Sequence, residues 1–380
     1  MTDADRYRIG FLDWLACAAR GMRERPVQAA KHAADGLSGR VAAVGAAGHV
    51  LDYDDTYAPG MVHASAPAAP VALLVAAERG LSAGAALDAY AAGYEATAAL
   101  ARASHPALYE RGWHPTSVCG PTGAAVTAAR LLGLSPDRER IAVGLALLSA
   151  GGLQAAFGTG GKALQVGRAA AAGLEAARLS AAGAHVDVDA VVAGFETAHG
   201  ATWAAPHGAP AIRGNWVKAY PCCLLTHAAI DAALELRAGG VRPEGELVVA
   251  VHPTARRAAP VDDPDDGLQA KFSVPYTAAH ALLHGAPAVE SFAAPDRAAR
   301  EFARQRIRVR TDAALLETEA RIELEGEVVA AVRHARGSPQ RPMDAAALAR
   351  KVDQLAPALA GALDDRDAPA AGVADAANLP

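Results

Sequence analysis

The first 237 residues of the chain carry long alanine-rich runs that are interrupted by glycine, a pattern typical of consecutive helices. Alanine has the highest intrinsic helix propensity, so these runs favour closely packed helices. Ser82 and Ser135 stand where helix N-caps are expected, and Pro136 stands at the first turn of the helix that follows. The pattern predicts helices at 67–79, 83–103, 122–132, from 136 onward, and 169–182.

The pattern changes after Gly239, where short segments alternate between apolar and polar residues. Alternation with a period of two is typical of strands with one buried face. We therefore predict a mainly α fold, with a large all-helical domain at 1–237 and a smaller α+β domain at 238–341. Strands are predicted at 246–252, 306–310, 320–325 and 328–332, and a helix at 274–283.

The C-terminal residues 342–380 are predicted to return to the helical domain. Asp344 is a plausible N-cap for an alanine- and leucine-rich helix that runs to residue 363. Residues 364–380 are rich in Ala, Asp and Pro, and we expect them to be frayed.

The composition excludes several classes of protein. The formal net charge is −5 and no helix carries a Lys/Arg stripe, so no nucleic-acid partner is expected. The four cysteines form no CxxC and have no zinc spacing, which favours free thiols in a cytoplasmic protein. The N-terminus has no signal-type apolar core, and the apolar stretch 141–158 is shorter than the roughly 20 residues of a membrane span. We interpret that stretch as a buried helix and expect no membrane association.

The densest group of chemically active side chains lies at 48–63. It contains Asp52, Asp54, Asp55 and Thr56, with His49 and His63 on either side. Buried carboxylates are costly unless they are paired or hydrogen-bonded, so the segment is either a solvated helix end or the floor of a site. The neighbouring loop lacks calcium-loop spacing, and we expect no metal here. The sharper hypothesis is acid/base chemistry by Asp52 with His63.

Two glycine-bracketed segments add an imidazole and a cation. His114 lies just before a predicted helix, where it is either a half-buried structural histidine or a group that meets an anion. Lys162 follows a Gly-rich turn that resembles a phosphate loop, but Ala163 replaces the required Ser/Thr. A surface lysine would be the default, but the apolar flanks favour a buried, paired cation.

Two later segments add further candidates. Lys218 precedes Pro221, which we expect to begin a helix, so that its ammonium lies near the positive end. Cys222 and Cys223 follow as small buried side chains or as a thiol pair. Tyr276 comes after a proline at a predicted helix start, and its ring packs between the domains or points its hydroxyl into a cleft between them. His227 is expected to be structural.

Together these groups suit a site that binds a small polycarboxylate. Lysines and an imidazolium neutralise the substrate's charge, and a histidine or aspartate transfers a proton next to a carboxylate. Composition alone does not single out one reaction.

The order of these segments resembles the MmgE/PrpD family, whose members include 2-methylcitrate dehydratase, cis-aconitate decarboxylase and iminodisuccinate epimerase. The motifs that carry the resemblance are HVLDYDDT (49–56), HAS (63–65), GYE (93–95), GWHPT (112–116), LLGL (131–134), Lys162 with GRAA (167–170), KAYPC (218–222) and KFSVPY (271–276). The resemblance implies a large helical domain with a smaller lid, a homodimer, and a site between the domains that uses neither metal nor cofactor.

The resemblance also implies the site residues. The catalytic positions are Asp52, His63, His114, Lys218 and Tyr276, and the substrate-binding positions are Thr56, Lys162 and Cys223.

Three positions depart from the family pattern. Cys223 stands where the decarboxylase branch has a histidine, Gln165 where many members have a histidine, and Ala64 where a proline follows the first histidine. Loss of an imidazole at position 223 counts against decarboxylation, because that histidine would be a natural proton donor. A lyase of the 2-methylcitrate dehydratase type is therefore the leading prediction, ahead of an aminodicarboxylate epimerase and of a non-catalytic paralogue.

Overall fold

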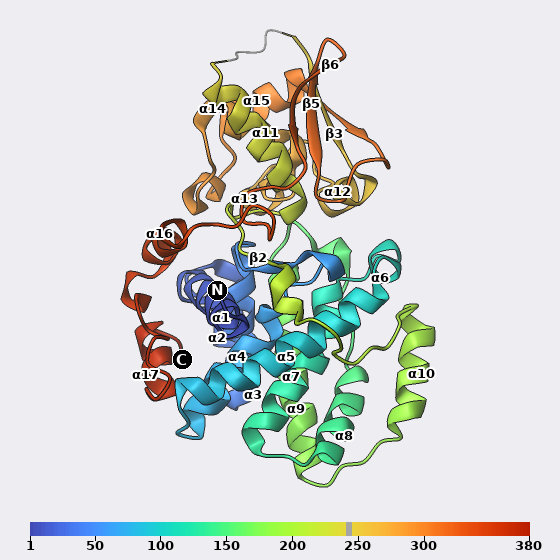
Figure 1. Ribbon diagram of the computed structural model, residues 1–380, viewed down its shortest axis with the longest axis vertical. Coiled ribbons are helices and arrows are strands. Elements are labelled where there is room, and N and C mark those ends of the chain that lie inside the picture. The colour runs from blue at the N-terminus through green and yellow to red at the C-terminus, as the bar shows by residue number, and fades with distance from the viewer. Residues whose placement is uncertain (241–244) are drawn as a thin grey trace.

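The computed structural model describes residues 1–240 and 245–380, and the fold is mainly α as predicted. Figure 1 shows a large helical part below and a smaller part with the main sheet above. The helices of the larger part are α1 (Asp3–Gly21), α2 (Arg25–His32), α3 (Gly36–Val50), α4 (Ser65–Glu78), α5 (Ala83–Ser104), α6 (Ala107–Glu110), α7 (Pro115–Leu132), α8 (Pro136–Leu147), α9 (Gly161–Ala181) and α10 (Val188–His199).

Helix α7 lies at the centre of the larger part and packs against α4, α5, α8 and α9. Small side chains allow the helices to approach closely. A Cβ on Gly93 of α5 would lie 2.0 Å from Thr127 Oγ1 of α7, and a Cβ on Gly123 would lie 1.9 Å from Thr97 Oγ1. The alanine-rich sequence therefore yields tight helix–helix packing at the places where glycine replaces alanine.

The smaller part contains a four-stranded sheet in the order β4-β3-β5-β6. Strand β3 (Leu247–Val251) pairs parallel to β4 (Ile307–Thr311) and antiparallel to β5 (Ala320–Leu324), which pairs antiparallel to β6 (Glu327–Val332). The helices of this part are α11 (His227–Ala238), α12 (Pro253–Ala258), α13 (Gly267–Ala270), α14 (Val274–His284) and α15 (Arg297–Arg306). Helices α11 and α14 cover the sheet and form a second hydrophobic core with it.

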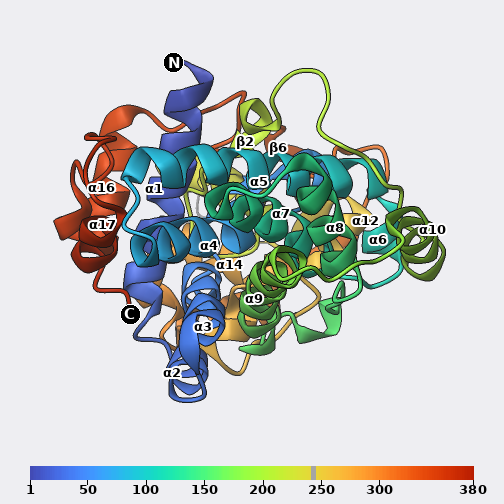
Figure 2. The ribbon, with the colours of Figure 1, turned by 90° about the horizontal axis from the view of Figure 1, so that it is seen from below.

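Two features join the parts. Strand β1 (Thr56–Tyr57) pairs antiparallel to β2 (Asn215–Trp216), so the acidic segment is tied to the chain that enters the smaller part. The C-terminal segment carries α16 (Ala345–Leu355) and α17 (Ala370–Ala376), which pack on α1 and α4 respectively. Seen from below, this segment lies along one edge of the molecule and α10 along the opposite edge (Figure 2). The domain boundaries at 237 and 341 remain predictions.

Several predicted elements differ in extent. The predicted helix at 343–363 ends at Leu355, and the tail is not frayed, because Ala370, Val373 and Ala374 are buried against the larger core. In the apolar stretch 141–158 the α-helix ends at Leu147, Leu148 is 64% exposed, and only a short 3-10 helix follows at Gln154–Ala156. No helix in the described part of the chain is both long and apolar enough to cross a membrane.

Candidate active site

Asp52 lies two residues beyond α3, in a left-handed conformation with a φ of 51°. Non-glycine residues adopt this conformation at a cost unless their surroundings hold them in it. Lys218 holds Asp52 in this conformation, because its Nζ donates to the Asp52 carbonyl at 2.6 Å and to Oδ1 at 3.1 Å. Lys162 Nζ donates to the same Oδ1 at 3.0 Å.

These contacts make Asp52 a buried, ionised carboxylate. Burial alone would raise its pKa, but Lys162 and Lys218 outweigh burial and hold the pKa well below its usual value. Its second oxygen, Oδ2, is buried without a hydrogen-bond partner among the described residues. That oxygen is a hydrogen-bond acceptor on a residue that lines the cavity described below.

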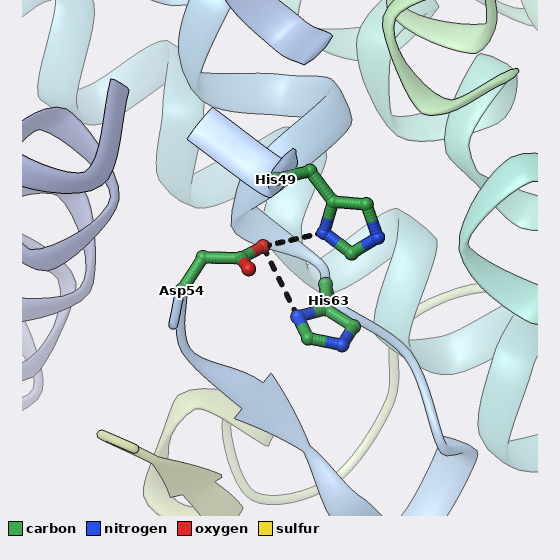
Figure 3. A group of neighbouring side chains, drawn as sticks. All are labelled: His49, Asp54 and His63. Atoms are coloured by element: carbon green, nitrogen blue, oxygen red, sulfur yellow. Dashed lines mark hydrogen bonds and ion pairs between the residues drawn. The ribbon is translucent and has the colours of Figure 1, made fainter. Parts of the chain in front are cut away.

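Asp54 binds two histidines through one oxygen (Figure 3). Its Oδ2 lies 2.9 Å from His49 Nδ1 and 3.0 Å from His63 Nδ1. The far nitrogen of His49, Nε2, lies 2.7 Å from Lys162 Nζ and must accept from that ammonium, so the proton of His49 is on Nδ1. Burial, with the charge of Lys162 assisting and Asp54 opposing, lowers the pKa of His49 to about 4.

His63 receives its orientation from the same carboxylate. Because a carboxylate only accepts, His63 donates through Nδ1, and its Nε2 carries a lone pair. That Nε2 lies 3.9 Å from Asp52 Oδ1. Burial lowers the pKa of His63, although Asp54 opposes this effect. The lowered pKa keeps the ring neutral and able to accept a proton.

The ligand atoms of His49, Asp54 and His63 lie within 4.8 Å of one another, close enough to be considered for a metal ion. Their separations of 2.9 and 3.0 Å are ordinary hydrogen-bond lengths, and the Lys162 ammonium contacts His49 directly. Lys162 donates to Nε2 of His49, so the same ring donates its Nδ1 proton to Asp54 and has no lone pair there for a cation. The donor set therefore fits a hydrogen-bonded network better than a metal centre.

His114 is the N-cap residue of α7, and the Pro115 that follows begins the helix. Its ring stacks on His49 with centroids 5.7 Å apart and meets the edge of Phe157 at 5.0 Å. Nδ1 contacts Gln165 Nε2 at 2.8 Å and Ser117 Oγ at 3.1 Å. Burial, aided by the charge of Lys162, keeps the pKa of His114 well below its usual value.

These groups converge on a cavity of about 40 Å³ that residues of both parts line. The larger part supplies the polar wall, and the smaller part supplies a mostly apolar wall that includes Leu224, Ala258 and Phe272. Lys162 Nζ lies 5.7 Å from the ring centroids of both Phe157 and Phe272, in cation–π contact with each wall. Ligand pockets usually measure about 300–1,000 Å³, so the cavity is small for a substrate site in this arrangement.

The structure brings most of the predicted site residues together. The cavity is lined by Asp52, Thr56, His63, His114, Lys162 and Cys223. Lys218 does not line it, because its side chain is completely buried behind Asp52. Nor does Pro221 begin a helix beside Lys218, since α11 starts only at His227.

Tyr276 is the predicted residue that the structure does not bring to the cavity. Its hydroxyl accepts a hydrogen bond from the Asp296 backbone N–H at 2.9 Å, and its ring is buried in the second core. Neither alternative predicted from the sequence describes Tyr276: its ring packs within the smaller part rather than between the domains, and its hydroxyl does not enter the cavity. The physical reason is that α14 packs on α11, α15 and β4, so the Tyr276 side chain is buried in the core that these elements form.

The cysteines are free and buried, as predicted. Burial raises the pKa of Cys223 to about 11, so its thiol faces the cavity in the neutral form. Cys222 lies behind it, with Sγ 3.3 Å from Thr226 Oγ1. Neither thiol has the electropositive surroundings of a nucleophile.

Two buried lysines near the site had no predicted role. Lys271 donates to the Leu51 carbonyl, and burial lowers its pKa to about 8. Lys351 of α16 donates to the Tyr53 carbonyl at 2.8 Å and to the Lys218 carbonyl at 3.0 Å, and it pairs with Asp13 at 2.6 Å. Lys271 lies within a recognised motif, but no local signal marks Lys351, which is 298 residues from Tyr53.

Comparison with known proteins agrees with this arrangement. The MmgE/PrpD N-terminal domain model matches residues 41–196, and the MmgE/PrpD C-terminal domain model matches residues 220–371. The mouse and human proteins named cis-aconitate decarboxylase are each 32% identical over 65% of this chain. A cis-aconitate decarboxylase-like protein of Aspergillus oryzae, oryM, is 53% identical over 49 residues, or 13% of the chain and 10% of that protein.

The matched regions span 55% of the mouse protein and 56% of the human one, so the chain covers little more than half the length of these relatives. The two domain models nevertheless account for most of the sequence in the expected order. The chain belongs to the MmgE/PrpD family.

Proposed function

We propose that this protein is a lyase that acts on a small di- or tricarboxylate, most specifically a dehydratase of the 2-methylcitrate type. The observation that carries the proposal is the convergence of Asp52, His63, His114 and Lys162 on one small cavity lined by both parts. A cation and neutral imidazoles in such a place can bind a carboxylate and move a proton beside it.

His63 is the base in the proposed reaction. Its Nε2 lone pair accepts the proton from the carbon next to a substrate carboxylate, while Asp54 orients the ring and stabilises the imidazolium that forms. The negative charge that develops on the substrate carboxylate is met by the Lys162 ammonium. The His63 imidazolium then returns the proton to the departing hydroxyl, which leaves as water, and the residues recover their starting protonation.

The unpaired Oδ2 of Asp52 supports a hydroxy acid as substrate. A buried carboxylate oxygen without a donor is costly, and a substrate hydroxyl would supply that donor. Cis-aconitate has no hydroxyl to offer. The neutral Cys223 thiol, at the position where the decarboxylase branch has histidine, is also a poorer proton donor than an imidazolium.

The cavity is small for a polycarboxylate, which favours a movement of the smaller part away from the larger one when substrate enters. The apolar wall formed by Leu224, Ala258 and Phe272 comes from the smaller part, so the motion would uncover the polar wall. We propose that this part acts as the lid.

The test is to incubate the full-length protein with 2-methylcitrate in D₂O and follow it by proton NMR. The expected result is an alkene signal that grows with time and is absent with an Asp52→Asn variant. Release of CO₂ from cis-aconitate, with no reaction of hydroxy acids, would replace the dehydratase proposal by the activity for which the mouse and human relatives are named.

An epimerase is the second candidate, because two imidazoles, those of His63 and His114, face one cavity and an epimerase returns the proton it removes. Exchange of the Cα hydrogen of an aminodicarboxylate for deuterium, without elimination, would favour it. Absence of every turnover, with carboxylate binding unchanged in a His114→Ala variant, would favour a non-catalytic paralogue.

We also propose that the protein is a homodimer, as the family resemblance implies. Light scattering on the purified full-length chain tests this: a mass near twice the 38.6 kDa of one chain is expected, and a single-chain mass at working concentration would contradict it.

A further inference from the structure

The two ring nitrogens of His114 have different surroundings. Nδ1 contacts Gln165 and Ser117, whereas the ring lines the cavity. Nε2 is therefore the nitrogen left to meet a bound ligand. Which nitrogen carries the proton decides whether His114 presents a donor or an acceptor to that ligand.

The backbone of Leu153 determines the orientation of the Gln165 amide. Leu153 N–H donates to Gln165 Oε1 at 3.0 Å, and Gln165 Nε2 donates to the Leu153 carbonyl at 3.2 Å. A backbone N–H can only donate, so the amide oxygen must face it. The reversed amide would place its NH₂ group against that N–H, and the geometry excludes it.

The oriented amide in turn determines the tautomer of His114. Gln165 Nε2, which can only donate, lies 2.8 Å from Nδ1, so Nδ1 accepts and carries no proton. The groups that face the ring are Lys162, His49, His63 and Asp52, and the net effect of burial and these charges keeps the ring neutral. A neutral ring with an unprotonated Nδ1 has its proton on Nε2.

His63 has the opposite arrangement. Asp54 accepts from Nδ1 of His63, which leaves an unprotonated Nε2. The two histidines thus carry their protons on different nitrogens, because Nδ1 of His63 contacts an acceptor and Nδ1 of His114 contacts a donor.

We propose that Gln165 is a positioning residue that fixes His114 as an N–H donor toward the cavity, so that His63 is the base and His114 holds a substrate oxygen. The proposal gives the two histidines of the cavity different roles. The inference relies on the proposed function only in taking this cavity as the substrate site.

Ring nitrogen NMR tests the proposal without any turnover. The full-length protein is prepared with ¹⁵N-labelled histidine, and the two signals are assigned with His114→Gln and His63→Gln variants. In the wild type we expect His114 to be protonated at Nε2 and His63 at Nδ1. A proton on Nδ1 of His114 would overturn the proposal, and this outcome is independent of whether the protein proves to be a dehydratase.

In the Gln165→Glu variant we expect the ring-nitrogen NMR signals of His114 to show a proton on Nδ1. A carboxylate only accepts, so His114 must place a proton on Nδ1, either by changing tautomer or by becoming an imidazolium with a raised pKa. We expect kcat to fall by about 10²-fold, the order of one lost polar contact to the developing charge, with a smaller change in KM. The pH dependence should also change, which a merely structural role would not produce.

Two further variants complete the test. Gln165→Met keeps the size of the side chain and removes its hydrogen bonds, so it should leave His114 able to sample both tautomers. Gln269→Glu introduces the same charge at a half-buried glutamine whose side-chain oxygen accepts from the Asp265 N–H, and it should leave the His114 signals unchanged. An unchanged His114 spectrum in a folded Gln165→Glu protein would also overturn the proposal.

Discussion

Asp52 and Asp55 lie three residues apart in one segment, and both are buried, yet they have opposite electrostatic character. Asp52 faces Lys162 and Lys218, and its pKa lies well below the usual value although burial opposes this. Asp55 accepts from Ser65 Oγ at 2.7 Å and from Asn215 Nδ2 at 2.5 Å, with no cation in contact among the described residues. Burial, reinforced by Asp13, raises its pKa well above the usual value.

The contrast shows that burial alone does not determine the charge of a carboxyl group. The partners decide: the two lysines that contact Asp52 outweigh its desolvation cost, whereas the hydroxyl and amide donors of Asp55 do not outweigh that of Asp55. Asp52 is the charged member and belongs to the cavity. Asp55 is the member whose pKa burial raises, and its bond to Asn215 supports the pairing of β1 with β2.

The largest effect is expected from Asp52→Asn. Removing this charge leaves Lys162 and Lys218 buried together without their shared partner, and breaking a buried pair usually costs about 3–5 kcal/mol. Turnover should fall by at least ~10²-fold, because the variant also alters the cavity wall. Urea unfolding and the alkene assay measure the two effects, and wild-type stability in the variant would mean that the lysines do not depend on Asp52.

The second-largest loss of stability is expected from Lys351→Met. This variant tests the contacts of Tyr53, which lies between Asp52 and Asp55. Lys351 holds the carbonyls of Tyr53 and Lys218, and its loss leaves Asp13 buried without its cation, so we expect a loss of about 3 kcal/mol in the free energy of unfolding. Lys31→Met, at an exposed position, is the matched control and should change stability by less than about 0.5 kcal/mol. Equal losses in both variants would refute a specific role for the buried pair.

Asp55→Asn should have a small effect at neutral pH whose sign depends on pH. A folded pKa above the unfolded value means that the native state binds more protons, so wild-type stability falls as pH rises from about 4 toward the folded pKa. Asparagine has no such dependence. Urea midpoints at pH 5 to 8 should therefore shift in favour of the variant as pH rises, while exposed Asp367→Asn should run parallel to the wild type; an opposite trend would mean that Asp55 is ionised.

The smallest effect on turnover and stability is expected from metal removal, which tests the role of Asp54. If Asp54 serves only the hydrogen-bonded network with His49 and His63, dialysis against EDTA should leave turnover and melting temperature unchanged. Elemental analysis should find less than one metal ion per chain before dialysis. Stoichiometric metal, with activity lost on removal and restored on its return, would make this group a metal centre.

Much of the local structure could be predicted from residues that act on their neighbours. Ser82 and Ser135 cap α5 and α8 as predicted, because capping depends on a backbone N–H three residues away. The alternation at 320–325 yields β5, because one face of the sheet is buried. The motifs around Asp52, His114 and Lys162 indicated the family, which the domain models confirm.

Other features depended on contacts between distant residues. Tyr276 carries a family motif, yet its hydroxyl bonds Asp296, and the polar tail at 364–380 packs on the helical core through Ala370 and Val373. Lys162 and Lys218 reach Asp52 across 110 and 166 residues of sequence. The chain by itself thus determined its helices, strands, family and the kinds of side chain at the site. Only the folded structure decided which carboxyls are charged and which nitrogen of each histidine carries the proton, because protonation depends on atoms brought within about 3 Å by packing rather than by sequence.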